Sequence, residues 1–235
     1  MQIIWHGQSC FQIITSQGKN NQVSIVIDPF FDEIGLKLPK IEADILLVTH
    51  HHQDHNNTKA VQSPKGGGNF FLIDGPGEYD VKNVFIGGIR AFHDNSQGKT
   101  TPTPRPPWFP PGLLGENTIY TIEAEDLKLC HLGDLGQKEL TDEQLEAIGE
   151  VDILFIPVGG VYTVAAKEAL NIMSQIEPHI TIPMHYQIPK LKVKLDGLDK
   201  FLKSLGIKSI VPENKLSIKK KDILPEEAKI IVLKP

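Results

Sequence analysis

Residues 45–55 read ILLVTHHHQDH, so an apolar run typical of a buried strand passes directly into four histidines and one aspartate. The end of a strand is where a rigid backbone presents functional side chains to an open loop. Metal binding satisfies imidazole and carboxylate groups that would be costly to bury unpaired, and zinc and similar ions prefer these ligands. A purification tag would sit at a terminus and would lack Asp54. The stretch therefore predicts a metal site that follows a strand.

Three other apparent strand ends also carry histidine or aspartate. His93 closes IRAFH (89–93), Asp134 follows LCHLG (129–133), and His185 closes IPMH (182–185). Each of these residues alone is typical of a capped turn or of a hydrogen-bonded surface side chain. Because four separate strand ends offer metal-ligating residue types, we expect them to converge on one site.

Short strands alternate with helices along the rest of the chain. Runs rich in Ile and Val, bounded by Gly, Pro, Asp or Asn, predict strands at residues 3–5, 11–15, 23–28, 45–49, 70–73, 84–92, 118–123, 127–131, 153–158, 180–184, 207–211 and 230–233. Capping patterns and apolar spacing predict helices at residues 141–149, 164–176 and 197–205. Thr141 and Gln144 match a capping box, and Thr163 is expected to cap the second helix.

This order of elements predicts an α/β fold. Strands dominate the early part of the chain and helices appear later between strands, which favours two mixed β-sheets packed face to face with helices outside. A length of 235 residues suits one domain spanning residues 1–235.

Composition excludes several classes of protein. Hydrophobic residues make up 40% and charged residues 23%, which excludes disordered, collagen-like and coiled-coil chains. The apolar stretches are too short to span a membrane, and the N-terminus lacks the features of a signal peptide. With only two cysteines the chain is no disulfide scaffold, so we expect a cytoplasmic protein. The net charge of −5 argues against nucleic acid as the main partner.

One segment has biased composition. Residues 100–112 read TTPTPRPPWFPPG, and six prolines predict a stiff, extended loop inserted between two neighbouring elements. Arg105 lies in this loop beside Trp108 and Phe109. These side chains could clamp an anionic or cyclic substrate, or they could form a contact between copies of the chain in a homo-oligomer. Both readings stay open.

The motif His50-x-His52-x-Asp54-His55, followed by His93, Asp134 and His185 in that order, resembles the metallo-β-lactamase fold superfamily of metal-dependent hydrolases. The resemblance covers nearly the whole chain. The segments HLGDLG (131–136), DILFIPVGG (152–160) and IPMHY (182–186) look like the branch that contains ascorbate-6-phosphate lactonase and related hydrolases. Relatives in this branch often carry Gly-His-Ser near the first strand, whereas this chain has Gly-Gln-Ser at residues 7–9.

The resemblance implies a four-layer αββα sandwich with a binuclear metal site at one edge of the sheets. In this reading one metal is held by His50, His52 and His93. The second is held by Asp54, His55 and His185, and Asp134 bridges the two. Zinc is the expected ion at both positions, and manganese and iron are the alternatives.

This ligand set suits hydrolysis of a small-molecule substrate. Two divalent ions about 3.5–4 Å apart can share one water and present a bridging hydroxide near neutral pH, with Asp54 as the catalytic residue that orients it or accepts its proton. The bond cleaved would be a phosphoester or phosphodiester, or a lactone or related ester, of an anionic substrate. Tyr186 is a candidate oxyanion donor, and His6 is a further candidate for substrate binding. His51 and His131 are expected to lie outside the ligand set.

Two alternatives remain at this point. One is a non-catalytic metal-binding or regulatory module that keeps the fold, although every ligand position is filled. The other is an iron-dependent redox enzyme, because histidine and carboxylate also suit iron.

Overall fold

The computed structural model of the protein describes residues 1–18, 21–64, 69–93, 115–224 and 227–235. One of its two large sheets has six strands. In spatial order these strands are β14 (Leu216–Ser217), β1 (Gln2–Gly7), β2 (Cys10–Gln17), β3 (Asn21–Ile27), β5 (Ile45–Leu47) and β7 (Phe71–Ile73). Strands β14 to β3 pair antiparallel, whereas β3, β5 and β7 run parallel. This first sheet is therefore mixed.

The second sheet has seven strands. In spatial order they are β15 (Lys229–Ile230), β13 (Ile180–Met184), β12 (Ile153–Pro157), β11 (Leu127–His131), β10 (Glu116–Ala124), β9 (Val84–Phe92) and β8 (Gly77–Val81). Strands β8 to β11 pair antiparallel, and β11, β12, β13 and β15 run parallel. A separate short pair joins β4 (Ile41–Glu42) to β6 (Val61–Gln62).

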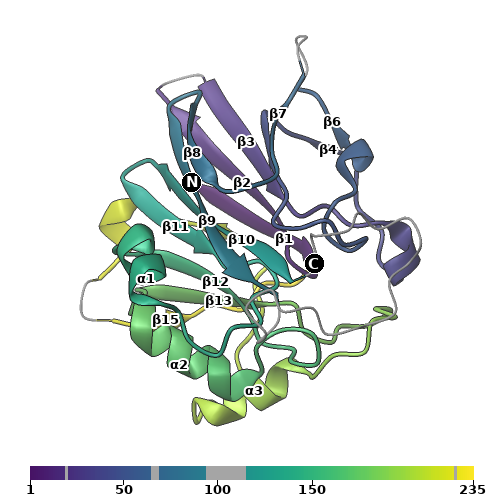
Figure 1. Ribbon diagram of the computed structural model, residues 1–235, viewed down its shortest axis with the longest axis vertical. Coiled ribbons are helices and arrows are strands. Elements are labelled where there is room, and N and C mark those ends of the chain that lie inside the picture. The colour runs from purple at the N-terminus through teal and green to yellow at the C-terminus, as the bar shows by residue number, and fades with distance from the viewer. Residues whose placement is uncertain (19–20, 65–68, 94–114, 225–226) are drawn as a thin grey trace.

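The helices α1 (Asp142–Ile148), α2 (Ala166–Ile176) and α3 (Leu198–Ser204) follow β11 in the chain and gather on the side of β12 and β13 (Figure 1). Short 3₁₀ turns are η1 (Asp32–Ile34), η2 (Thr58–Ala60) and η3 (Lys220–Asp222). The predicted capping box is confirmed, since the Thr141 hydroxyl accepts from the Gln144 backbone N–H and the Thr141 N–H donates to the Gln144 side chain. Among the described residues no helix is long and apolar enough to cross a membrane.

The core lies between the two sheets. Phe11 of β2 and Phe155 of β12 meet there, with their ring centroids 4.5 Å apart. Every residue of β12 and β13 is buried, and each large apolar side chain buried in this way contributes about 1.5–3 kcal/mol. The predicted α/β sandwich of two mixed sheets is confirmed.

Several predicted boundaries are wrong. Residues 207–211 form no strand; Val211 is 87% exposed, and the edge beside β13 is taken by β15 instead. Strand β8 was missed because its glycine and acidic residues indicate a turn. Thr163 does not cap α2, because that helix begins at Ala166 with no side-chain cap. The proline-rich segment 100–112 lies outside the described residues.

Candidate metal centre

The predicted convergence of strand ends has a simple topological basis. Strands β9, β11 and β13 run in the same direction within the second sheet, so their carboxyl ends lie at one edge. His93, Asp134 and His185 follow these three strands. The loop after β5 brings the fourth set of side chains from the first sheet, and its Thr49 carbonyl accepts a hydrogen bond from the Thr118 N–H of β10 (2.9 Å).

The structure brings all seven predicted ligand residues together in two groups. The imidazole group contains His50, His52 and His93, and the mixed group contains Asp54, His55, Asp134 and His185. Within each group the potential ligand atoms all lie within 4.8 Å of one another.

Asp134 lies between the two groups. Its Oδ2 atom is 3.1 Å from the Nε2 atom of His55 and 3.3 Å from that of His185, in the mixed group. The same oxygen is 3.5 Å from His93 Nε2 and 3.9 Å from His50 Nε2, in the imidazole group. One carboxylate oxygen thus faces four imidazoles contributed by three different loops.

The electrostatics of the centre keep its carboxylates ionised. Burial would raise the pKa of the Asp134 carboxyl, but His185 and His55 hold this pKa well below its usual range. Burial and the neighbouring His55 and His52 lower the pKa of His50 well below the ordinary histidine value, and burial beside His93 lowers the pKa of His52 to about 4. His50 and His52 are therefore neutral at pH 7, which is the form that binds a metal.

His55 behaves differently. Burial would lower its pKa, but Asp134, Asp54 and Asp28 raise it well above the ordinary value. His55 Nε2 lies 3.1 Å from Asp134 and 3.4 Å from Asp54 without a well-directed hydrogen bond to either. A buried nitrogen facing two carboxylate oxygens is an arrangement that a cation would satisfy. The donor chemistry of both groups therefore fits divalent metal ions.

Asp28 positions His55, and sequence reasoning missed it. It directly follows β3 in a left-handed conformation (φ +49°) and accepts hydrogen bonds from the Thr49 N–H (2.8 Å) and the Thr49 hydroxyl (2.7 Å). It also lies 2.9 Å from His55 Nδ1, which directs the Nε2 atom of that ring to the mixed group. Such outer carboxylates fix the tautomer and orientation of a ligating histidine. The available signal was a further aspartate at a strand end.

The loop that carries Asp134 is held by Asn117 and His131. The Asn117 side chain accepts from the Asp134 N–H (3.0 Å) and donates to the Leu132 carbonyl (2.8 Å). Gly133 allows this approach, because it has φ +58° and a Cβ there would lie 2.3 Å from Asn117 Oδ1. The His131 ring accepts from the Gly133 N–H (3.1 Å) and reaches the Ser9 carbonyl (2.9 Å). His131 therefore supports the loop from outside both groups.

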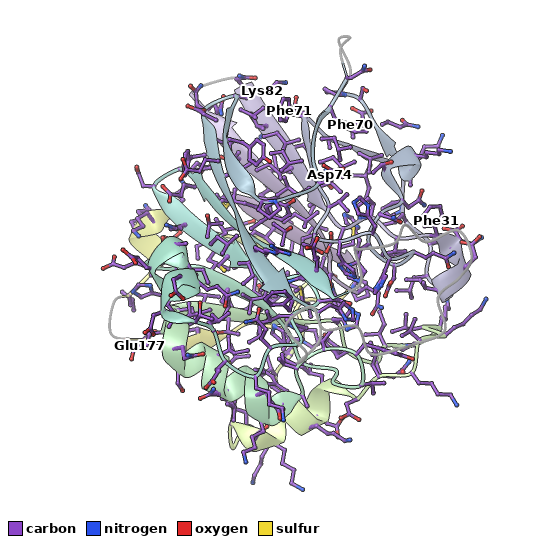
Figure 2. The ribbon with its side chains drawn as sticks, in the orientation of Figure 1. Phe31, Phe70, Phe71, Asp74, Lys82 and Glu177 are labelled. Carbon is purple, nitrogen blue, oxygen red and sulfur yellow. The ribbon has the colours of Figure 1, made fainter. Side chains whose placement is uncertain are left out.

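A cavity of about 580 Å³ opens beside the two groups. His52, Asp54, His93, Asp134 and His185 line one part of it, and the remaining lining residues are Glu33, Ile34, Gln53, Tyr162, Lys192, Val193 and Lys194. A backbone hydrogen bond joins η1 to the loop after β5, because the N–H of Phe31, labelled in Figure 2, donates to the Gln53 carbonyl (3.1 Å). None of the lysines was singled out from the sequence, because no local pattern distinguishes them from other exposed lysines.

Two of the three candidate substrate-binding residues, His6 and Tyr186, do not line this cavity. His6 and Tyr186 line a separate cavity of about 870 Å³, where the Tyr186 ring packs 5.1 Å from Trp5. Arg105 lies outside the described residues. His51 is half-buried and belongs to neither ligand group. Substrate contact by His6, Tyr186 or Arg105 stays a prediction.

Comparison with known proteins gives a consistent family. The family model described as "Beta-lactamase superfamily domain" matches residues 2–185. A UPF0173 metal-dependent hydrolase of Thermococcus onnurineus is 28% identical over 202 residues, which cover 77% of this chain and 82% of the relative. A UPF0173 metal-dependent hydrolase of Thermoplasma volcanium is 30% identical over 204 residues, covering 79% and 83%.

A solved structure extends the similarity across the whole chain. A Thermotoga maritima protein assigned to the Zn-dependent hydrolases of the metallo-beta-lactamase superfamily superposes with a TM-score of 0.73. It is 35% identical, and the match covers 99% of this chain and 97% of that protein.

Proposed function

The chain belongs to the beta-lactamase superfamily of metal-dependent hydrolases, and we propose that it holds two divalent metal ions and cleaves a small anionic substrate. The bond would be a phosphoester or phosphodiester, or a lactone or related ester. The observation that carries this proposal is the position of Asp134 Oδ2, which faces imidazoles of both groups at 3.1–3.9 Å.

The proposed roles follow from the two groups. His50, His52 and His93 would hold one metal; Asp54, His55 and His185 would hold the second, with Asp134 bridging the two. Two such ions supply a water activated near neutral pH and polarise the oxygen of the scissile bond. Imidazole-rich sites suit zinc and iron, and carboxylates also accept manganese. Zinc is the metal we propose.

Asp54 is the proposed catalytic carboxylate. Its side chain is 19% exposed and lines the cavity, whereas the Asp134 side chain is only 3% exposed. Its pKa lies well below the usual range, because His55 and His185 outweigh the effect of burial. It is therefore ionised at neutral pH and open to the cavity, as needed to orient the attacking water and accept its proton.

Lys192 and Lys194 support the proposal that the substrate is anionic. Both are exposed, both line the cavity, and neither forms an ion pair with another described residue. The backbone between them is fixed, because the Lys192 N–H donates to the Ile34 carbonyl (2.8 Å) and the Gln187 side chain bonds to the Leu191 carbonyl (3.2 Å) and the Leu195 N–H (3.0 Å). Unpaired cations beside a cavity raise the local concentration of anions.

We also propose a single-domain organisation and a cytoplasmic location. The core is continuous between the two sheets, which supports a single domain over residues 1–235. Cys10 and Cys130 are both buried and unpaired, which supports a reducing compartment such as the cytoplasm.

The test combines metal content with turnover. Elemental analysis of protein purified without added metal is expected to give two metals per chain and to identify them. A panel of a bis-aryl phosphodiester, an aryl phosphomonoester and a lactone should then reveal turnover that a chelator abolishes. Failure to bind two metals even after zinc or manganese is supplied would contradict the proposal. Iron with redox activity and no hydrolysis would replace it by the redox alternative.

A further inference from the structure

The turn between β1 and β2 reaches the metal centre. Ser9 donates its hydroxyl to Asp134 Oδ1 (3.2 Å), and the carboxamide Nε2 of Gln8 donates to Asp54 Oδ2 (3.2 Å). Both side chains are fully buried. The turn thus touches both carboxylates of the centre.

Gln8 is held in an unfavourable backbone conformation. Its φ of +49° is left-handed, a region that non-glycine residues rarely adopt. Its carbonyl accepts from the Trp5 indole N–H (2.8 Å) and from the His185 N–H (3.2 Å). Conformations of this kind persist where the surroundings over-determine them, and they cluster at functional sites. The backbone therefore aims the Gln8 side chain in one fixed direction.

The head of the Gln8 side chain has ligand-like spacing. Its Nε2 position is 3.2 Å from Asp54 Oδ2 and 3.4 Å from His185 Nε2, which are two potential ligand atoms of the mixed group. Ligands bound about 2.1 Å from one metal ion at tetrahedral angles are themselves about 3.4 Å apart. The other head atom, Oε1, is buried with no hydrogen-bond partner among the described residues.

We infer that Gln8 is an additional ligand of the metal in the mixed group, through its carboxamide oxygen. The inference rests on the proposed function, because it requires a cation held by Asp54, His55, Asp134 and His185. The amide oxygen and nitrogen exchange places by rotation about the last side-chain bond. In the orientation that bonds to Asp54, the positive N–H hydrogens would point at this cation. Rotation replaces them with the carbonyl oxygen.

A ligand oxygen from Gln8 would change the metal preference of the mixed group. A carbonyl oxygen is a hard ligand, which suits manganese and magnesium better than it suits zinc. Gln8 therefore adds oxygen character to a group that already contains two carboxylates, whereas the imidazole group is all nitrogen. We expect the loss of Gln8 to weaken manganese binding more than zinc binding.

The direct test is a crystal structure of the full chain loaded with Mn²⁺. We expect the ion of the mixed group to lie about 2.0–2.3 Å from Gln8 Oε1. A Gln8 head that still bonds through Nε2 to Asp54, more than about 3 Å from the ion, would overturn the assignment.

Calorimetric titration with Mn²⁺ provides a second test. Gln8→Gly removes the side chain but suits the left-handed backbone, so a loss of affinity cannot come from added backbone strain. It should weaken Mn²⁺ binding at the mixed group by about 10-fold or more, with a smaller effect on Zn²⁺. Gln8→Glu keeps an oxygen in reach and should retain or tighten Mn²⁺ binding. If Gln8 served only as a donor to Asp54, Gln8→Gly would weaken Mn²⁺ and Zn²⁺ binding by the same factor.

Gln12→Ala is the matched control, because Gln12 lies on the same hairpin and donates to Ser24 rather than to the metal groups. It should bind two metals as the wild type does. Equal Mn²⁺ affinity in the wild type and Gln8→Gly, with two metals bound in each, would overturn this inference and leave the proposed function intact. A wild type that binds no metal in the mixed group would overturn both.

Discussion

The imidazole group and the mixed group are neighbours, but the fold supports them differently. In the mixed group His55, Asp134 and His185 are at most 2% exposed, whereas His52 and His93 of the imidazole group are half-buried at the cavity. The mixed group has hydrogen-bond partners on two separate strand connections, which are Asp28 after β3 and the turn of Gln8 and Ser9 between β1 and β2. In the imidazole group His50 bonds to the adjacent Thr49 and to His52 itself.

The two groups are therefore prepared for metal binding to different degrees. Ligands whose orientation is fixed before binding lose less conformational freedom when the metal arrives. The mixed group also contains ionised carboxylates, which attract a cation more strongly than neutral imidazoles do. We therefore expect the mixed group to bind its metal first and more tightly, and the imidazole group to load second and exchange faster.

The variant Asp134→Ala should have the largest effect, because it removes the one side chain shared by both groups. We expect stoichiometric binding of the second metal to be lost and kcat/KM to fall by about 1000-fold or more, beyond the 10–100-fold typical of outer partners. Elemental analysis and steady-state kinetics measure the two effects. Asp80→Ala, an exposed carboxylate on β8, is the control. Two metals retained per chain would show that Asp134 does not bridge.

Asp28→Asn should lower the metal affinity of the mixed group without lowering that of the imidazole group. The amide keeps the size of the side chain but presents N–H groups to donors on Thr49 and His55, so His55 loses its orientation. Metal affinity of the mixed group should fall by about 10–100-fold, while the imidazole group keeps its affinity. Titration with Zn²⁺ resolves the two binding events. Equal weakening at both groups would show that the contrast in support between them has no energetic consequence.

Much of the centre could be predicted from the sequence, because its proposed ligands follow strand ends. An apolar run that ends in His or Asp is visible in the sequence, and parallel strands bring such ends to one edge. Asp28 was within reach of the same reasoning, since it also directly follows a strand. It was not singled out because one aspartate before a proline is equally typical of a turn.

Gln8, Lys192 and Lys194 lay beyond sequence reasoning. The contact between Gln8 and Asp54 joins residues 46 positions apart. It also depends on a left-handed backbone at Gln8, which no sequence pattern around this residue predicts. The lysines line the cavity because the loop that carries them packs on Gly35, where a Cβ would lie 2.2 Å from the Lys190 carbonyl. At residues 207–211 the sequence instead predicted a strand that does not form, because β-propensity without a partner strand does not make a strand.

The double variant Lys192→Ala/Lys194→Ala should have a smaller effect that leaves both metal groups intact. Each exposed charge contributes about 0.2–1 kcal/mol, so KM for an anionic substrate should rise by about 2–30-fold with metal content unchanged. A neutral substrate should show no change in KM. Lys208→Ala, an exposed lysine outside the cavity, is the control. An equal rise in KM for neutral substrates would assign the effect to loop packing rather than to charge.

His51→Ala should have the smallest effect, although His51 stands between two proposed ligands. The chain turns through residues 50–52 so that His50 and His52 face each other, with 3.1 Å between His50 Nε2 and His52 Nδ1, while His51 joins neither group. A change in stability within about 0.5 kcal/mol and unchanged binding of two metals are expected. His52→Ala, one residue away, should lose the metal of the imidazole group. If elemental analysis shows the same loss in both variants, the contribution of this stretch comes from its overall histidine content and not from the direction of each side chain.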